Sequence, residues 1–442
     1  MHTSPASPDR STAGFNRNCY AVVLVFLCVV VPVREHFAPA GEADFTQYYM
    51  AGLMAKQGMW DAIYPVPIPG AKFIPAAPQG SIAKPQYAAA AQSAGIHGDP
   101  WRVVQAPPVC LLFAPLAMFP LHTAFLFYRF LSTICVWVVA LYAGLIAGRI
   151  IGRPTRLSGS VAALIGASPN SLATIRTGNV SSIVAALIAV AIYELQARDG
   201  WRGGAAALGA FVLKYASFPL LPVAIVAGRL RTVAWAALLL LAFVLIPIPF
   251  IGVAPYREFA FKIAPHFDQL EAYYGNQALR AVLARCWANA DPPVTFLHAF
   301  SIVRWATFAL FVFVLYSARC RIQTSARLIA SASALMLCWF LIFSPVAHAH
   351  YYLYIFPLWG WLIIELRRVR FGLALATIAI ALMWIPLAGG RWSHLPLVIS
   401  AHMLLAAIIM MVVALISIVR READRGSMMS HSTAAIESTV SD

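Results

Sequence analysis

The chain contains little acid and little charge of any kind. Only 17 of its 442 residues are Asp or Glu, and charged residues make up 11% of the sequence. Soluble globular domains usually carry about 25% charged residues, so this composition excludes a soluble globular protein. Because acidic side chains are so scarce, the positions at which they do occur carry information about function.

The sequence also lacks the signatures of several enzyme classes. It holds no Walker phosphate-binding loop, no HExxH pair, no GxSxG and no CxxC, which argues against ATP-driven, zinc-dependent and serine-hydrolase chemistry. The seven cysteines are scattered and show no metal-ligand spacing. We expect no cofactor and no metal, since His348 and His350 alone are too few ligands for a metal site.

Hydrophobic residues, by contrast, make up 61% of the chain, and apolar stretches of bilayer-spanning length recur along nearly all of it. This pattern predicts an all-α polytopic integral membrane protein. The net charge of +15 is explained by Lys and Arg at cytoplasmic helix ends, so we expect membrane lipids and no nucleic acid as partners.

The arginine clusters predict the topology. If all of them lie in the cytoplasm, the segments between them cross in pairs, which gives about 12 transmembrane segments. Residues 159–175 are expected to cross once and to pair with 180–195. Residues 203–228 are interpreted as two short segments in a hairpin whose tip, 214–218, points outward, because a single crossing there would invert every later cluster.

This topology defines the predicted domains and the location. Residues 1–17 form a cytoplasmic N-terminal tail, 18–419 a multi-span membrane domain, and 420–442 a cytoplasmic C-terminal tail. Two long extracytoplasmic loops are expected at about 39–105 and 253–299. The apolar run "PPVCLLFAPLAMFP" (107–120) is too short and too rich in proline to span. The expected location is the plasma (inner) membrane, with both termini in the cytoplasm.

Unexpected polar residues gather on the predicted outer side. Ionisable groups at membrane depth are costly and usually face a cavity or one another. These residues come from separate segments, which predicts an aqueous cavity that opens outward and lies close to lipid. The residues are Asp44, 177–179, Lys214, 273–280, His348, His350, Arg391 and His394, with Arg129 and Arg304 near the outer ends of their spans.

A cation-rich cavity of this kind suits an anionic lipid head group. Lys214, Arg280 and Arg304 could neutralise a phosphate, and Asp44 could take a proton from an incoming hydroxyl. Displacement of a lipid phosphate from a sugar needs only one carboxylate, whereas glycoside hydrolysis generally uses a matched pair. Glu42 is a rival for the role of base, because it would point the same way as Asp44 if this stretch were an extended loop.

Six short motifs occur in order over roughly residues 40 to 360: "ADFTQYYMAG", "PPVCLLFAPLAMFP", "TGNVSS", "LKYASFP", "NQALR" and "SPVAHAHYY". In these motifs the chain resembles glycosyltransferase family 87 of the GT-C superfamily, which includes polyprenyl-phosphate-mannose-dependent mannosyltransferases. The resemblance implies a GT-C-like fold. It also implies transfer of a sugar from a polyprenyl-phosphate donor to a lipid or glycan hydroxyl at the extracytoplasmic face, with mannose as the first candidate for the sugar.

By the same resemblance, Asp44 is the general base. The expected donor- and phosphate-binding residues are Lys214, Arg280, His350, Asn276, Gln277, Asn179, Tyr351, His348 and Arg304. The sequence departs from the family pattern at three of its positions: Asn179 stands where Gln is common, and Ala349 and Tyr351 flank His350 where an acid and a second His are frequent. These departures leave the sugar open, and a pentose such as arabinose is an alternative to mannose.

Two other functions compete with this hypothesis. A transporter or flippase of polyprenyl-linked sugars would share the hydrophobic body and the basic cavity, but it would more often show internal repeats and acids buried in mid-span. Here Glu194 and Glu365 lie at predicted cytoplasmic helix ends beside arginines and are interpreted as interfacial ion pairs. Another lipid-linked transfer, such as ligation, is the third possibility.

Overall fold

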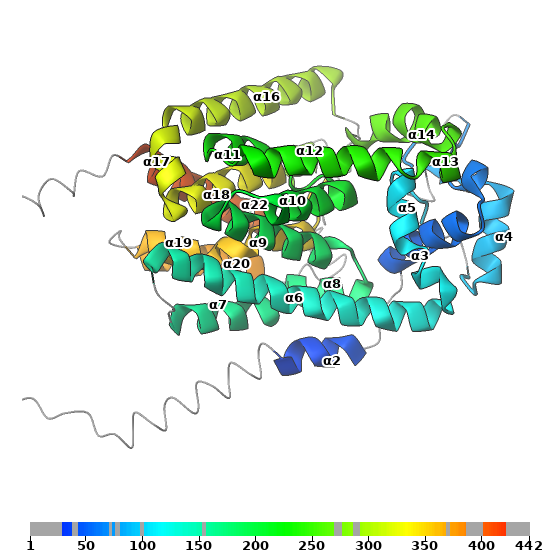
Figure 1. Cartoon of the computed structure of the whole chain (residues 1–442), viewed down its shortest axis with the longest axis horizontal. Coiled ribbons are helices and arrows are strands. Elements are labelled where there is room, and N and C mark those ends of the chain that lie inside the picture. Colours follow the sequence, from blue (N-terminus) through cyan, green and yellow to red (C-terminus); the bar gives the residue numbers. More distant parts are fainter. Residues whose placement is uncertain are drawn as a thin grey trace, which may run out of the picture.

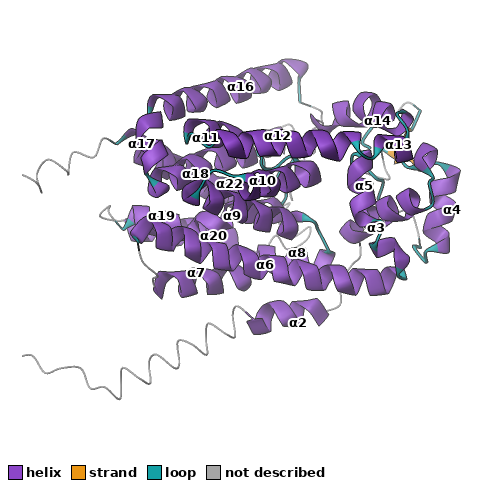
Figure 2. Ribbon diagram, in the orientation of Figure 1, coloured by secondary structure: helices purple, strands orange, loops and turns teal. Residues whose placement is uncertain are grey.

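The computed structural model of the chain describes residues 29–37, 43–69, 73–75, 80–97, 101–152, 156–268, 276–285, 292–367, 372–385 and 401–420. Helices make up nearly all of this part of the chain (Figure 2). Its one sheet is a two-stranded antiparallel ribbon of β1 (Val66–Pro67) and β2 (Ser81–Ile82). The predicted tails, residues 1–17 and 420–442, lie outside the described residues except for Arg420.

Long helices run side by side through the molecule, and short helices gather at one end of it, at the right in Figure 1. The described helices, in chain order, are α2 (Val31–Phe37), α3 (Ala43–Lys56), η2 (Trp60–Ala62), α4 (Pro85–Ser93), α5 (Pro107–Phe113), η3 (Leu116–Met118), α6 (Leu121–Ile151), α7 (Arg156–Gly166), α8 (Pro169–Thr177), α9 (Ser181–Ala197), α10 (Trp201–Lys214), α11 (Leu220–Val226), α12 (Leu230–Leu245), α13 (Ile248–Ile251), α14 (Ala254–Glu258), η4 (Phe259–Ile263), η5 (Ala264–Asp268), α15 (Leu279–Ala284), α16 (Val294–Ser317), α17 (Arg319–Thr324), α18 (Ala326–Phe343), η7 (Ala349–Leu358), α19 (Trp359–Leu366), α20 (Gly372–Trp384) and α22 (His402–Val419).

Five helices in the described chain are long and apolar enough to cross a membrane: α6, α12 continued through α13, α16, α18 and α22. α18 is buried for most of its length, whereas α12 and α16 expose large apolar side chains such as Leu238, Leu241 and Phe313. Such faces suit contact with lipid tails, where helices satisfy their backbone hydrogen bonds internally. The prediction of a helical membrane protein is confirmed, while the 12 crossings and the two long outer loops stay predictions.

The apolar stretch 159–175 differs from its prediction as one continuous segment. It forms two short helices, α7 and α8, separated at Ala167 and Ser168. Ser168 caps α8, because its side-chain oxygen accepts a hydrogen bond from the Ser171 N–H, and Pro169 occupies the first helical position. A capping serine followed by proline is a helix start signal, and here it interrupts an otherwise apolar run.

The predicted reversal of the chain within residues 203–228 is confirmed. α10 ends at Lys214, and Tyr215 adopts a left-handed conformation with φ 53° before Pro219 leads into α11. The chain then returns to the beginning of α10, where the Arg229 Nε donates to the Leu195 carbonyl at 2.9 Å. The Thr232 N–H also donates to Asp199, directly before α10, at 2.7 Å.

The two sequence regions predicted as outer loops pack against each other. Lys84 from the first region forms an ion pair of 3.0 Å with Glu258 from the second, and the rings of Tyr64 and Phe259 lie 6.0 Å apart. α3, α4, α5 and α14 therefore cluster beyond the ends of the long helices (Figure 1). The run 107–120 folds as α5 and η3, and α5 has only seven residues, too few to span.

Candidate active site

Asp44 lies in the first turn of α3. This position favours a negative charge, because the helix dipole and the unpaired backbone N–H groups are positive there. One carboxylate oxygen, Oδ2, accepts a hydrogen bond from the Asn179 Nδ2 at 3.1 Å. The expectation of an extended loop around Asp44 is therefore wrong at this residue, and the rival base Glu42 lies outside the described residues.

Asn179 reaches Asp44 because a glycine turn joins α8 to α9. Gly178 ends α8 in the left-handed conformation, with φ 66°. A β-carbon at this position would lie 2.8 Å from Phe125 Cε2 and 2.9 Å from Phe45 Cβ. Only glycine combines this backbone conformation with so close an approach. The motif "TGNVSS" thus brings the turn against α3 and α6 and places Asn179 beside the carboxylate.

We expect Gly178→Ala to destabilise the protein more than Gly152→Ala does. Gly152 has a similar conformation, φ 76°, but among the described residues other than its chain neighbours no atom lies within 4 Å of the position its β-carbon would take. Both substitutions incur the left-handed backbone strain of about 1–2 kcal/mol, and only Gly178→Ala adds steric overlap. The measurement is the midpoint of thermal unfolding in detergent, together with turnover. Equal shifts in the two variants would show that the turn is not tightly packed.

Lys214 is the last residue of α10 and contacts Asn179 on the side away from Asp44. Its ammonium lies 3.2 Å from Asn179 Oδ1, 3.3 Å from Ser181 Oγ and 3.4 Å from His350 Nε2, and 4.1 Å from the centre of the Tyr351 ring. All three hydrogen bonds are longer than the usual 2.9–3.0 Å. Within the described chain no carboxylate lies at ion-pair distance from Lys214. Burial lowers the pKa of Lys214 to about 7, so an anion that binds beside it would stabilise the charged form of the side chain.

His350 completes the group from η7. Burial, with the neighbouring charge of Lys214, lowers the pKa of His350 well below its usual range, so the imidazole is neutral. Its Nε2 accepts from Lys214, because an ammonium has no acceptor. The rings of Tyr351 and Tyr354 stack next to it, 5.6 Å apart.

The motifs "NQALR" and "SPVAHAHYY" are joined by the side chain of Asn276. Its Nδ2 donates to the Pro345 carbonyl at 3.0 Å, and its Oδ1 accepts from the backbone N–H groups of Ala347 and Ala278. The Gln277 N–H donates to the Ala347 carbonyl at 2.9 Å. This network fixes the backbone directly before His348 and His350, so the role of Asn276 at the edge of the site is structural.

Arg280 and His348 belong to the two segments that Asn276 joins, whereas Arg304 lies on a separate helix, α16. Arg280 is buried in α15, four residues after Asn276. The His348 and His350 rings stack with centroids 5.5 Å apart. Arg304 lies on α16 with its guanidinium 5.1 Å from the centre of the Trp305 ring. The structure brings Asp44, Asn179, Lys214 and His350 into one chain of contacts, which we call the Asp44–His350 chain.

Two site residues were missed by the sequence analysis. Ser181 is fully buried, and its hydroxyl lies 3.3 Å from the Lys214 ammonium and 3.1 Å from the Tyr354 hydroxyl. Ser181 belongs to the quoted "TGNVSS", where an Asn two residues before a Ser is typical of a side-chain turn that starts a helix. Nothing in the sequence distinguished Tyr354 from other buried aromatic residues.

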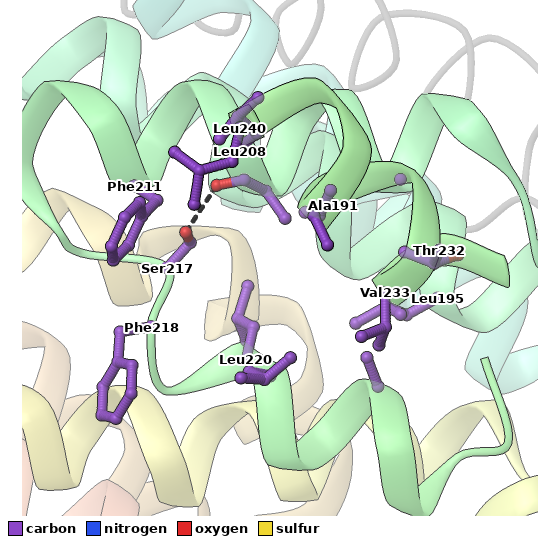
Figure 3. Close-up of a pocket in the computed structure, with 16 residues that line it drawn as sticks. Ala191, Leu195, Leu208, Phe211, Ser217, Phe218, Leu220, Thr232, Val233 and Leu240 are labelled. Atoms are coloured by element: carbon purple, nitrogen blue, oxygen red, sulfur yellow. Dashed lines mark hydrogen bonds between the residues drawn. The ribbon is translucent and has the colours of Figure 1, made fainter. Parts of the chain in front are cut away.

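An apolar pocket of about 320 Å³ lies among the helices that flank the turn after Lys214. Its walls come from α9, α10, α11 and α12, and Figure 3 shows Phe211, Ser217 and Phe218 at one end and Leu195, Thr232 and Val233 at the other. Ser217, at one end of the pocket, follows Lys214 by three residues in the sequence. Ser217 donates to the Ala207 carbonyl at 2.5 Å, which leaves little polar surface in the pocket.

A comparison with protein-family models finds that the model of glycosyltransferase family 87 matches residues 106–345. This range is more than half of the chain and includes Asn179, Lys214 and Arg280. A comparison with curated proteins finds no match. The predicted family is confirmed, and the chain belongs to glycosyltransferase family 87, a GT-C-type family of membrane glycosyltransferases.

Proposed function

We propose that the protein transfers a sugar from a polyprenyl-phosphate donor to a hydroxyl of a lipid or glycan. Mannose is the first candidate for this sugar. The observation that carries this proposal is the Asp44–His350 chain, which begins with a carboxylate and contains, beyond Asn179, the Lys214 amine, a group with no carboxylate at ion-pair distance in the described part of the protein. A carboxylate can accept a proton, and an ammonium can bind a phosphate. We place the site at the extracytoplasmic face of the plasma (inner) membrane.

In the proposed reaction the acceptor oxygen attacks the anomeric carbon of the donor sugar. A new carbon–oxygen bond forms there, and the bond to the phosphate oxygen breaks with its electron pair staying on the phosphate. Asp44 takes the proton of the acceptor hydroxyl. Lys214 stabilises the leaving polyprenyl phosphate, and its three long, neutral contacts allow the ammonium to turn toward that anion.

The apolar pocket supports a lipid-linked donor over a nucleotide sugar. Its volume of about 320 Å³ falls in the range of small-molecule sites, about 300–1,000 Å³. Its lining consists mainly of Leu, Ala, Val and Phe side chains, and its two hydroxyl groups, of Ser217 and Thr232, already form hydrogen bonds (Figure 3). We propose that the isoprene units nearest the phosphate occupy it, since Phe211 and Ser217, which line one end of the pocket, each lie three residues from Lys214 in sequence.

Filling the pocket should weaken the binding of long-chain donors selectively. Ala207 lines the pocket, so Ala207→Leu should raise KM for a polyprenyl donor about tenfold, or ~1.4 kcal/mol. KM for a donor analogue with a single isoprene unit should change much less. Ala205→Leu is the matched control, because Ala205 is half-buried on the same helix and does not line the pocket. Parallel changes for both donors would exclude the pocket as the chain site.

The function itself is tested with membranes that contain the protein and a panel of radiolabelled polyprenyl-phosphate sugars. We expect label to move into a lipid or glycan fraction, with mannose tried first and arabinose next. Membranes containing Asp44→Asn serve as the control for other enzymes. A panel in which no donor gives more product than the control would exclude the proposal.

Transport of a polyprenyl-linked sugar is a second candidate, and one observation favours it. α10 ends at Lys214 within an apolar segment, before the chain reverses into α11, and helices interrupted within the membrane also form substrate sites in transporters. The acids within the apolar helices do not add support. The predicted pairing of Glu194 and Glu365 with arginines is confirmed, with distances of 2.6 Å to Arg198 and 2.5 Å to Arg327.

A further inference from the structure

The orientation of the Asn179 side chain is fixed by the groups around it. Its Oδ1 accepts from the Ser181 N–H at 3.0 Å and faces the Lys214 ammonium at 3.2 Å, and both of these groups are donors. A flipped amide would place its own donors against them. The Nδ2 must therefore face Asp44, whose carboxylate is an acceptor.

This arrangement places a neutral amide between the carboxylate and the ammonium. Asn179 is 4% exposed, so the contacts are shielded from water. Without the amide, Asp44 and Lys214 could form a direct ion pair, which would occupy both the base and the cation that the reaction needs. With the amide present, Asn179 engages Asp44 through one hydrogen bond to Oδ2, and the carboxylate keeps acceptor capacity for a proton.

We propose that Asn179 is a positioning residue for the base and not a ligand of the donor phosphate. It orients the Asp44 carboxylate by one hydrogen bond and separates it from Lys214. This inference rests on the proposed function, in which Asp44 is the base. It changes the part expected of Asn179, which the sequence resemblance placed among the donor-binding residues.

The titratable groups near Asp44 come from three neighbouring elements and from its own helix. Lys214 of α10 and Tyr128 of α6 interact with it electrostatically, as does Tyr48 on α3 itself. His350 of η7 lies behind Lys214 at 3.4 Å. None of these places a second carboxylate beside Asp44, so a new carboxylate there is a specific perturbation.

The test variant is Asn179→Asp, which keeps the shape of the side chain and replaces the amide donor by a carboxylate oxygen. Two facing carboxylates repel, so one of them holds its proton to higher pH. We expect the rising limb of the pH profile of kcat/KM to shift upward by about one pH unit or more. Asn179→Ala should lower kcat about 10-fold or more and also raise donor KM, because the base loses its orientation and a direct Asp44–Lys214 ion pair would occupy the cation that binds the donor.

The matched control is Asn170→Asp. Asn170 is a buried amide on α8, 2% exposed, and within the described chain its Nδ2 has no hydrogen-bond partner. A carboxylate at this position shows how much an extra buried acid that is not in contact with Asp44 lowers the stability of the protein. A purely structural role for Asn179 would lower the thermal unfolding midpoint in both variants and leave the pH profile of the remaining activity unchanged.

A second readout does not depend on activity. Dicyclohexylcarbodiimide reacts with protonated carboxyl groups in apolar surroundings, and mass spectrometry identifies the modified residue. In Asn179→Asp we expect modification at Asp44 or at the introduced carboxyl group, at a pH at which wild-type Asp44 is unmodified. In Asn170→Asp we expect no change at Asp44. Wild-type pH profiles and labelling in Asn179→Asp would overturn the inference while leaving the proposed function in place. Full activity of Asp44→Asn would overturn both.

Discussion

Replacing Asp44 by Asn should reduce turnover by about 10²–10⁴, the usual effect of removing a general base. The two side chains have nearly the same shape, but the amide cannot take the proton of the acceptor hydroxyl. The amide oxygen of the variant can still accept from Asn179, so the site keeps its geometry. Donor affinity should stay near the wild-type value, because Lys214 and the apolar pocket are unchanged. The measurement is initial rate against donor concentration for purified protein in detergent.

Two control variants test whether this effect is specific to Asp44. Glu42→Gln should have a much smaller effect, because the hydrogen bond from Asn179 selects Asp44. Asp61→Asn, in the exposed part of η2, should leave turnover unchanged. A loss confined to Glu42→Gln would move the base to that residue. Normal turnover in both Asp44→Asn and Glu42→Gln would exclude a carboxylate base from this segment.

Replacing Lys214 by Met should weaken donor binding about 10- to 100-fold. Methionine keeps the length of the side chain and removes the charge, and hydrogen bonds to a charged group contribute about 1.5–3 kcal/mol each. The effect should appear in KM for the donor and in competition by polyprenyl phosphate without sugar. Turnover should also decrease, because the same ammonium stabilises the leaving phosphate.

The matched control for Lys214 is Lys262→Met. Lys262 belongs to the same predicted outer side, with a side chain that is 72% exposed and 3.9 Å from Glu258. Removing its charge changes the net charge of the protein by the same amount. If both variants weakened donor binding equally, the effect would come from the overall charge and not from a phosphate site at Lys214.

Much of the fold was predictable because its causes are local. Apolar runs fix which segments become membrane helices, and α6, α16 and α18 follow them closely. The reversal after Lys214 was predicted from charge parity, and its physical basis is the left-handed Tyr215 followed by Pro219. The break between α7 and α8 was missed, because the Ser168–Pro169 start signal lies inside an apolar run.

The residues of the candidate site were predictable, but the contacts between them were not. Scarcity of acid drew attention to Asp44, a lysine in an apolar segment drew attention to Lys214, and the family resemblance added Asn179 and His350. The hydrogen bond between the Asn179 amide and Asp44 could not be predicted, because the two residues are 135 positions apart in sequence. Their contact depends on Gly178 packing against Phe45 and Phe125, which is a property of three elements together.

The central claim is that the protein breaks the bond between the sugar and the polyprenyl phosphate. Purified protein in liposomes, supplied with a polyprenyl-phosphate sugar labelled in the sugar and with extracted membrane lipid as acceptor, tests this directly. We predict that label moves from the donor to a new product, that unlabelled polyprenyl phosphate is released in equal amount, and that Asp44→Asn forms neither. Movement of intact labelled donor between the two leaflets, with no product and no release of polyprenyl phosphate, would contradict the claim and identify a transporter.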